Sequence, residues 1–194
     1  KTKIKKKITQ KYRLYKNKKI IIISVPPYAE HNFTNWDKHW EHINFLIKTT
    51  CELNQNVLLS LHPKNEKAIY KHLESKYNVR ILEETLASVV ASANMFVAPF
   101  SSTVVFAILC GVKTVVVDTL NLNFKQYDYL KSLKIVKKND YLKNILVRTL
   151  NTNVNFDLDW KILGKEQLFD GKTIDRYISL LLEVSQNSKS TNLN

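Results

Sequence analysis

The fold of this 194-residue chain is decided by residues 95–118, which read MFVAPFSSTVVFAILCGVKTVVVD. Two short apolar runs, Met95–Ala98 and Val115–Val117, enclose a polar turn and a longer apolar stretch that ends at Gly111. This order predicts strand, helix and strand, with Gly111 as the C-terminal cap of the helix. A helix between two buried strands is typical of a parallel sheet.

The same alternation extends on both sides of this unit. Further strands are expected at Ile20–Val25, Val57–Leu61, Val79–Leu82 and Leu133–Val136. A helix capped by Thr34 follows the first strand, and its apolar face is expected to carry Trp36, Trp40, Ile43, Ile47 and Cys51. The next helix should turn Ala68, Ile69 and Leu73 inward, and further helices are expected at Leu86–Ala93, Tyr141–Leu150 and from Ile174. We therefore predict an α/β fold, a Rossmann-like open parallel sheet of about six strands with helices on both faces.

The net charge of +13 is concentrated at the start of the chain. Residues 1–19 hold ten Lys or Arg and no acid, whereas residues 20–194 hold twenty basic and seventeen acidic groups. Such a run is typical of a solvated arm or interdomain linker, here residues 1–18, with contact to an acidic membrane as the alternative. Nucleic acid is not an expected partner, because no stacking aromatics line a folded basic face. Residues 19–150 then form the α/β domain, 151–184 a helical extension and 185–194 a polar tail.

Further features of the sequence indicate where the protein is located and whether it binds a metal. No apolar run approaches the length of a membrane span and no signal-peptide core is present, so we expect a cytoplasmic protein, with membrane contact only as a peripheral association. Cys51 and Cys110 lie in apolar patterns without metal-ligand spacing, which predicts reduced core cysteines and no metal site. The chain starts without Met inside a basic stretch. We expect a further domain to precede it.

Polar residues follow each predicted strand, at the edge where open parallel sheets bind ligands. The residues that meet this criterion are Tyr28, Glu30, His31, Asn32, His62, Lys64, Asn65, Ser101, Ser102, Thr103, Asp118 and Thr119. Of these, the candidate binding residues are His31, His62, Lys64, Ser101, Ser102, Thr103 and Asp118. Hydroxyls before a buried helix suit a phosphate, although one serine there could equally be a simple N-cap. His62 and His31 could donate to phosphate oxygens, whereas His39, His42 and His72 are interpreted as helix-surface residues. Only three glycines occur in the chain, which argues against a Gly-rich phosphate loop.

As a set, the segments 62–65, 78–82, 99–103 and 111–117 resemble the C-terminal half of GT-B glycosyltransferases and of hydrolysing UDP-N-acetylglucosamine 2-epimerases. The resemblance covers about residues 19 to 150. The His62-Pro63 pair and the Ser101-Ser102 turn followed by Phe106 look closest to polymerases that use CDP-glycerol. Those epimerases carry an Asp-Ser-Gly-Gly turn where this chain has Pro99-Phe100-Ser101-Ser102.

The resemblance implies a nucleotide-sugar donor, UDP- or CDP-linked, with no other cofactor. Ser101, Ser102 and Thr103 would hold the diphosphate. Residues 81–84 would flank the base, with Leu82 and Glu83 as the candidate contacts, and Asp118 is the candidate for ribose. The catalytic base of such transferases belongs to an N-terminal Rossmann-like domain that this chain lacks, so the catalytic residues are unknown. The isolated domain should then bind nucleotide weakly and catalyse little.

Three functions stay open at this point. The first is the donor-binding domain of a GT-B glycosyltransferase that acts on a glycan or polysaccharide acceptor in surface polysaccharide synthesis. The second is a hydrolysing UDP-sugar 2-epimerase. The third is a non-catalytic α/β interaction module, which would bind no nucleotide, and fold alone does not separate the three.

Overall fold

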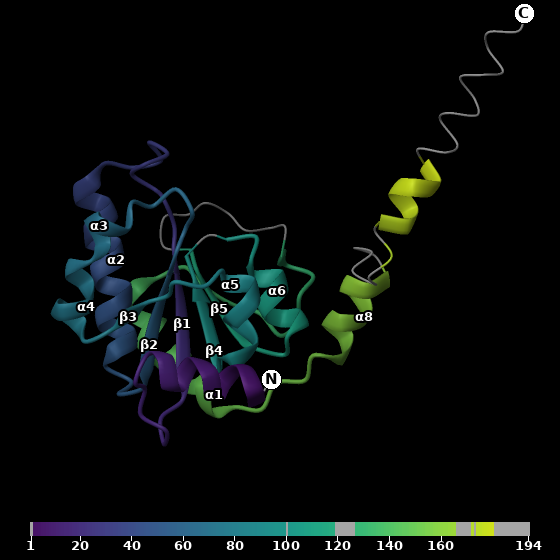
Figure 1. The fold of residues 1–194 in the computed structure, drawn as a ribbon, viewed down its shortest axis with the longest axis horizontal. Helices are drawn as coiled ribbons and strands as arrows, with labels where there is room; N and C mark the ends of the chain where they lie inside the picture. Colours follow the sequence, from purple (N-terminus) through teal and green to yellow (C-terminus); the bar gives the residue numbers. More distant parts are fainter. Residues whose placement is uncertain (1, 100, 119–126, 166–171, 173, 181–194) are drawn as a thin grey trace, which may run out of the picture. The chain divides into compact units, whose positions relative to one another are not determined.

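A computed structural model of the chain describes residues 2–99, 101–118, 127–165, 172 and 174–180. Two compact units are present, residues 1–156 and residues 157–194. The first contains a sheet whose strands run in the order β3-β2-β1-β4-β5-β6, and every pair of neighbours is parallel (Figure 1). These strands are β1 (Ile20–Val25), β2 (Asn56–Leu61), β3 (Arg80–Ile81), β4 (Met95–Ala98), β5 (Lys113–Val117) and β6 (Lys134–Val136). The predicted open parallel sheet is confirmed, and its order reverses between β1 and β4.

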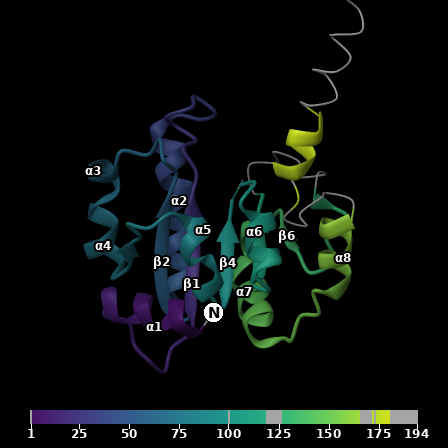
Figure 2. The ribbon, with the colours of Figure 1, turned by 45° about the vertical axis from the view of Figure 1, so that its right-hand side comes forward.

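Helices cover both faces of this sheet (Figure 2). One layer consists of α2 (Trp36–Cys51), α4 (His72–Tyr77) and α7 (Leu142–Asn151). The other consists of α1 (Thr2–Lys11), α5 (Leu86–Val89), the 3-10 turn η1 (Val90–Ser92) and α6 (Val104–Leu109). Short turns of helix, α3 (Lys67–Tyr70) and η3 (Asn139–Tyr141), precede α4 and α7. The arrangement is a doubly covered sheet, as the apolar runs of its strands require.

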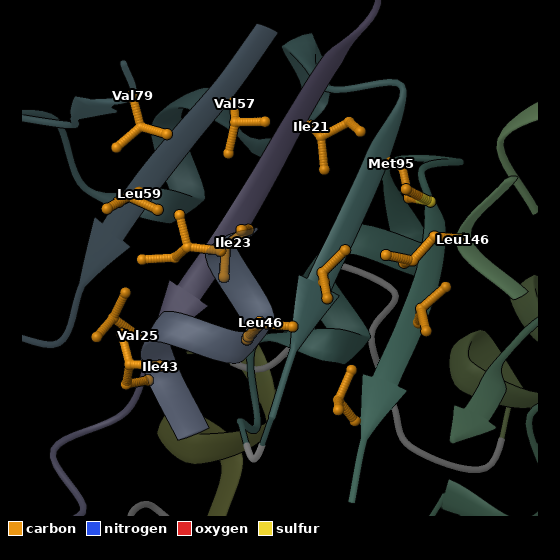
Figure 3. Close-up of a cluster of buried hydrophobic side chains, with 14 of the residues drawn as sticks. Ile21, Ile23, Val25, Ile43, Leu46, Val57, Leu59, Val79, Met95 and Leu146 are labelled. Carbon is orange, nitrogen blue, oxygen red and sulfur yellow. The ribbon is translucent and has the colours of Figure 1, made fainter. Parts of the chain in front are cut away.

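The core between the sheet and α2 is built by alternate residues of the strands (Figure 3). Ile21 and Ile23 of β1 pack with Ile43 and Leu46 of α2, and all four side chains are 0% exposed. Ile22, which points to the opposite face of the sheet, is also 0% exposed. Both faces of β1 are therefore removed from water, as expected for one of the two central strands of the sheet.

Helix α2 begins one residue later than predicted. Its N-cap is Asn35, whose Oδ1 accepts a hydrogen bond from Lys38 N at 2.9 Å, so the expected cap at Thr34 is wrong. Ile43 and Ile47 are buried as predicted, but Trp36 at the first turn is 40% exposed. Asn54, which follows the helix, has a φ of 54°, a left-handed conformation that Asn tolerates well.

The helical segment after β2 faces the core with Leu73, as predicted, but with Tyr70 in place of Ala68 and Ile69. Ala68 and Ile69 are exposed, whereas Tyr70 and Leu73 are fully buried. The segment is divided at Lys71 into two short helices, α3 and α4. A single helical repeat along the whole segment therefore does not predict which of its residues face the core. The Tyr70 hydroxyl also takes part in a polar cluster described below. The cluster supplies hydrogen-bond partners for the hydroxyl, so the tyrosine side chain can be buried.

The N-terminal basic segment differs from the expected solvated arm, because residues 2–11 form the helix α1. Ile8 is 1% exposed and Tyr12 9% exposed. Lys5 Nζ donates a hydrogen bond to Asn94 Oδ1 at 3.3 Å. The spacing of Ile4, Ile8 and Tyr12 is the helical signal that the lysine run conceals, and the helix belongs to the first compact unit.

In the second unit, α8 (Asp157–Lys165) lies within the predicted helical extension 151–184, in a stretch where no individual helix was predicted. Residues 174–180 are helical, as predicted for Ile174, Tyr177 and Ile178. The predicted polar tail 185–194 and the residues Leu181 and Leu182 lie outside the described part of the chain. No helix among the described residues is long and apolar enough to cross a membrane.

Candidate functional site

The loops that follow β1, β2, β4 and β5 emerge at one edge of the sheet. The register aligns the strand ends, with Val25 beside Leu61 and Ala98 beside Val116. His62, the Ser101 turn and Asp118 each follow one of these ends, so the topology brings them to the same edge. The point where the strand order reverses lies between the first and third of these loops, which is where such sheets bind ligands.

His31 and His62 form one part of this edge. Their ring centroids are 6.0 Å apart at an interplanar angle of 90°, although 31 positions separate them in the chain. His62 Nδ1 accepts a hydrogen bond from the backbone N–H of Lys64 at 3.1 Å. Burial, followed by the charges of His31 and Lys64, lowers the pKa of His62, whereas Glu30 acts in the opposite direction. The predicted residues His31, His62 and Lys64 are thus brought together.

A buried polar cluster that the candidate list omitted supports the two histidine loops. Asn65 Nδ2 donates to Glu30 Oε1 at 2.7 Å and to Tyr70 Oη at 2.9 Å. Tyr70 Oη donates to Glu30 Oε1 at 2.7 Å and lies 2.9 Å from His39 Nε2. Burial opposes ionisation of Glu30, but the bonds from Tyr70 and Asn65 outweigh it and lower the pKa of the carboxylate. The cluster joins the loops after β1 and β2 to helices α2 and α3.

Two histidines of this region correct the sequence interpretation. His39 and His42, expected on the helix surface, are 0% and 7% exposed, whereas His72 is exposed as expected. Burial lowers the pKa of both buried imidazoles, and that of His42 falls to about 4. Both imidazoles lie on the inward face of α2. There the ring of Tyr28 packs against His42, and the ring of Tyr70 packs against His39.

The serine turn between β4 and α6 forms the second part of the edge. Ser101 Oγ accepts a hydrogen bond from Thr103 N at 3.2 Å and lies 2.5 Å from Thr103 Oγ1. Thr103 is the N-cap residue of α6, and Ser102 is exposed. The helix is not buried on every side as expected, because Phe106 is 44% exposed. Ser101 therefore organises the turn, and Ser102 presents its hydroxyl to solvent.

Leu82 and Glu83, predicted beside a nucleobase, follow β3 at the sheet edge. Leu82 is 7% exposed, and its N–H donates to Leu59 O at 2.8 Å. Glu83 is exposed and pairs with Lys11 Nζ at 2.9 Å. Hence α1 contacts the loop that was expected to hold the base.

Asp118 directly follows β5, and its N–H donates to Val136 O at 2.8 Å. It is only 2% exposed, and its charge adds to burial in raising the pKa of Tyr28. Its carboxylate thus lies in the interior near Tyr28, with little surface for a ribose. Thr119, the next polar residue of this loop, lies outside the described residues.

No group of three or more His, Cys, Asp or Glu side chains in the described ranges is arranged to hold a metal ion. Neither Cys51 nor Cys110 forms a disulfide, and both are half-buried. Burial raises the pKa of the Cys51 thiol to about 11, which keeps it protonated near neutral pH.

The open parallel sheet with helices on both faces corresponds to one Rossmann-like half of a GT-B fold. Among solved structures, the glycosyltransferase VinC in complex with dTDP is similar over 92% of this chain at a TM-score of 0.59 and 13% identity. The UDP-GlcNAc 2-epimerase of Methanocaldococcus jannaschii is similar over 82% of the chain (TM-score 0.55, 11% identity). The wall teichoic acid polymerase TagF is similar over 96% (TM-score 0.52, 14% identity).

These likenesses cover 44%, 50% and 46% of the respective neighbours, so the chain spans about half of their length. No protein-family model matches the sequence. No curated protein matches it either. At 11% to 14% identity, these neighbours establish the fold alone.

Proposed function

We propose that this chain is the nucleotide-sugar-binding half of a GT-B glycosyltransferase. The observation that carries the proposal is that the His31–His62 loops and the Ser101–Thr103 turn lie at the same carboxyl edge of a sheet whose order reverses there. The acceptor is a glycan or polysaccharide, and the second Rossmann-like half supplies the catalytic base. This division of roles agrees with the length of the neighbours, about twice the matched part.

In the proposed complex, the diphosphate of the donor lies between the two parts of this edge. The Ser102 hydroxyl and the turn before α6 donate to one phosphate, and His62 with Lys64 donates to the other. As the bond to the sugar breaks, negative charge grows on the leaving nucleoside diphosphate, and fixed donors stabilise that charge. Leu82 and Glu83 lie beside the base, and no metal takes part in the scheme.

A hydrolysing UDP-sugar 2-epimerase is the second candidate, and the likeness to the Methanocaldococcus jannaschii epimerase favours it. The two reactions give different products in a protein that carries both halves. A transferase moves the sugar to an acceptor, whereas the epimerase releases UDP and an epimerised free sugar. A non-catalytic module would bind no nucleotide.

Calorimetric titration of the purified chain with UDP, CDP and UDP-N-acetylglucosamine tests the proposal. We expect one nucleotide to bind and the Ser101→Ala, Ser102→Ala double variant to weaken binding by about 1 to 3 kcal/mol, the range for lost hydrogen bonds to a charged group. The control is the Ser75→Ala, Ser179→Ala double variant, which removes two exposed helix hydroxyls and should bind as the parent does. Absence of binding by both the folded chain and a two-domain form would reject the proposal.

A further inference from the structure

The tautomer of His62 follows from its contacts. A backbone N–H can only donate, so the bond from Lys64 N requires that His62 Nδ1 be an unprotonated acceptor. In the neutral ring the proton then resides on Nε2. Because the side chain is exposed, this N–H is available as a donor to an anionic ligand.

The turn that makes this contact is held by Asn65. Its Oδ1 accepts from the backbone N–H of His62 at 2.6 Å, and the N–H of Asn65 itself donates to His62 O at 2.8 Å. The amide thus closes residues 62–65 into a hydrogen-bonded turn, and this turn places Lys64 N beside the imidazole.

The orientation of the Asn65 amide is fixed by the cluster behind it. Asn65 is 8% exposed, and its Nδ2 donates to both Glu30 and Tyr70. A flipped amide would place Oδ1 against the Glu30 carboxylate and Nδ2 against the N–H of His62, so both pairs would repel. The second carboxylate oxygen, Glu30 Oε2, is buried and has no hydrogen-bond partner among the described residues. Glu30 therefore depends on the donors from Asn65 and Tyr70 to remain ionised.

We propose that Asn65 is a positioning residue that sets His62 in the Nε2–H tautomer, the form that donates to the ligand. The chain of contacts runs from Glu30 and Tyr70 through the Asn65 amide to the backbone of residues 62–64 and then to the imidazole. That the ligand is a nucleotide diphosphate rests on the proposed function, whereas the setting of the tautomer does not.

The groups that face His62 give the direction of the pH effect. Protonation at Nδ1 would break the bond from Lys64 N, and the neighbouring His31 and Lys64 also disfavour a positive ring, while Glu30 favours it. Burial is the largest cause that lowers the pKa of His62, and the charges of His31 and Lys64 act in the same direction. Loosening the turn should therefore raise this pKa toward its ordinary value of 6.5.

Nitrogen-15 NMR of labelled histidine measures both quantities in the ligand-free chain. The parent protein should show His62 as the Nε2–H tautomer, and Asn65→Ala should show a mixture of both tautomers and a raised pKa. Asn44→Ala is the matched control, because it removes an amide that bonds Lys76 and Tyr77 on another surface. The proposal is overturned if folded Asn65→Ala keeps the parent tautomer and pKa, or if Asn44→Ala produces the same change.

Tyr70→Phe provides a second variant if Asn65→Ala does not fold. It keeps the ring in the core and removes one of the two acceptors of the Asn65 amide, so the same changes should occur with smaller amplitude. An unchanged His62 spectrum in Tyr70→Phe, with Asn65→Ala unfolded, would also reject the proposal.

A double-mutant cycle then connects the turn to the ligand. With the nucleotide that binds best, Asn65→Ala should weaken binding about tenfold in the parent, the effect of one lost hydrogen bond, and have no further effect in His62→Ala. An equal loss in both backgrounds would contradict a role through His62. If no nucleotide binds at all, the proposed function fails, but the NMR result still decides the role of Asn65.

Discussion

Tyr12 donates a hydrogen bond from Oη to Glu84 Oε2 at 2.5 Å and accepts one from Glu83 N at 2.8 Å. One residue of the N-terminal segment thus holds both acidic residues of the loop after β3. Lys11 adds ion pairs to Glu83 at 2.9 Å and to Glu84 at 2.7 Å. The basic segment is therefore part of the folded unit, and part of its charge is neutralised there.

Replacing Tyr12 by Phe should lower the free energy of unfolding by about 1 to 3 kcal/mol, because a hydrogen bond to a charged, half-buried carboxylate is lost. Urea denaturation measures the change. Tyr15→Phe is the control, since Tyr15 is 62% exposed, and it should differ from the parent by less than about 0.5 kcal/mol. Equal stability of Tyr12→Phe and the parent would show that the contact does not hold the segment.

The ionised carboxylate of Glu84 should stabilise the fold near neutral pH, and this stabilisation should be lost in acid. Burial favours its neutral form, but the bonds from Lys11 and Tyr12 outweigh burial and lower its pKa from 4.5 to about 2. The unfolded chain therefore binds the proton first, and the stabilisation is complete above pH 4.5 and lost as the pH falls toward 2. Urea midpoints measured across this range should fall less steeply for Glu84→Gln than for the parent, and parallel curves would contradict the assignment.

His42 should also lower the stability as the protein is acidified, but in a higher pH range than Glu84. Burial, assisted by the nearby His39, lowers its pKa from 6.5 to about 4. Between these values the unfolded chain binds a proton that the folded chain excludes, so stability falls as the pH decreases, by at most about 1.4 kcal/mol per pH unit. Thermal unfolding of His42→Gln should show a smaller slope between pH 6.5 and 4 than the parent. The same slope in both proteins would contradict this prediction.

The inward face of the segment after β2 can be tested with a pair of substitutions. Leu73→Ala should cost about 2 to 5 kcal/mol, because it leaves a cavity beneath α4. Ile69→Ala, at a residue 38% exposed, should change stability by less than about 1 kcal/mol. Denaturant midpoints of the two variants decide the point, and the reverse ranking would contradict an inward Leu73 and an outward Ile69.

Much of the fold could be predicted because its signals are local. The apolar runs of β1 and β4 match the predicted strands, and Gly111 with a φ of 62° ends α6 as expected. The errors in the predicted elements arose where the local sequence fits two interpretations. Asn35 caps α2 in place of its neighbour Thr34, and the lysines of α1 hid an apolar stripe that only its packed partners make significant.

Part of the candidate site was also predictable, since the end of each strand is visible in the sequence and the sheet edge follows from parallel topology. The cluster of Glu30, Asn65, Tyr70 and His39 was not. Its members lie up to 40 residues apart, and each alone is an ordinary polar residue. The signal that could have found it is Asn65, the last residue of the His62 turn.

The sequence by itself determined the alternation of strands and helices and the position of the polar loops after the strands, because hydrophobic periodicity and turn residues act over a few positions. Only the tertiary structure decided which polar residues are buried together and which N-terminal residues join the core. Burial of His39 or Glu30 is acceptable only when a distant side chain supplies its hydrogen bond, and that partner exists only once the chain has folded.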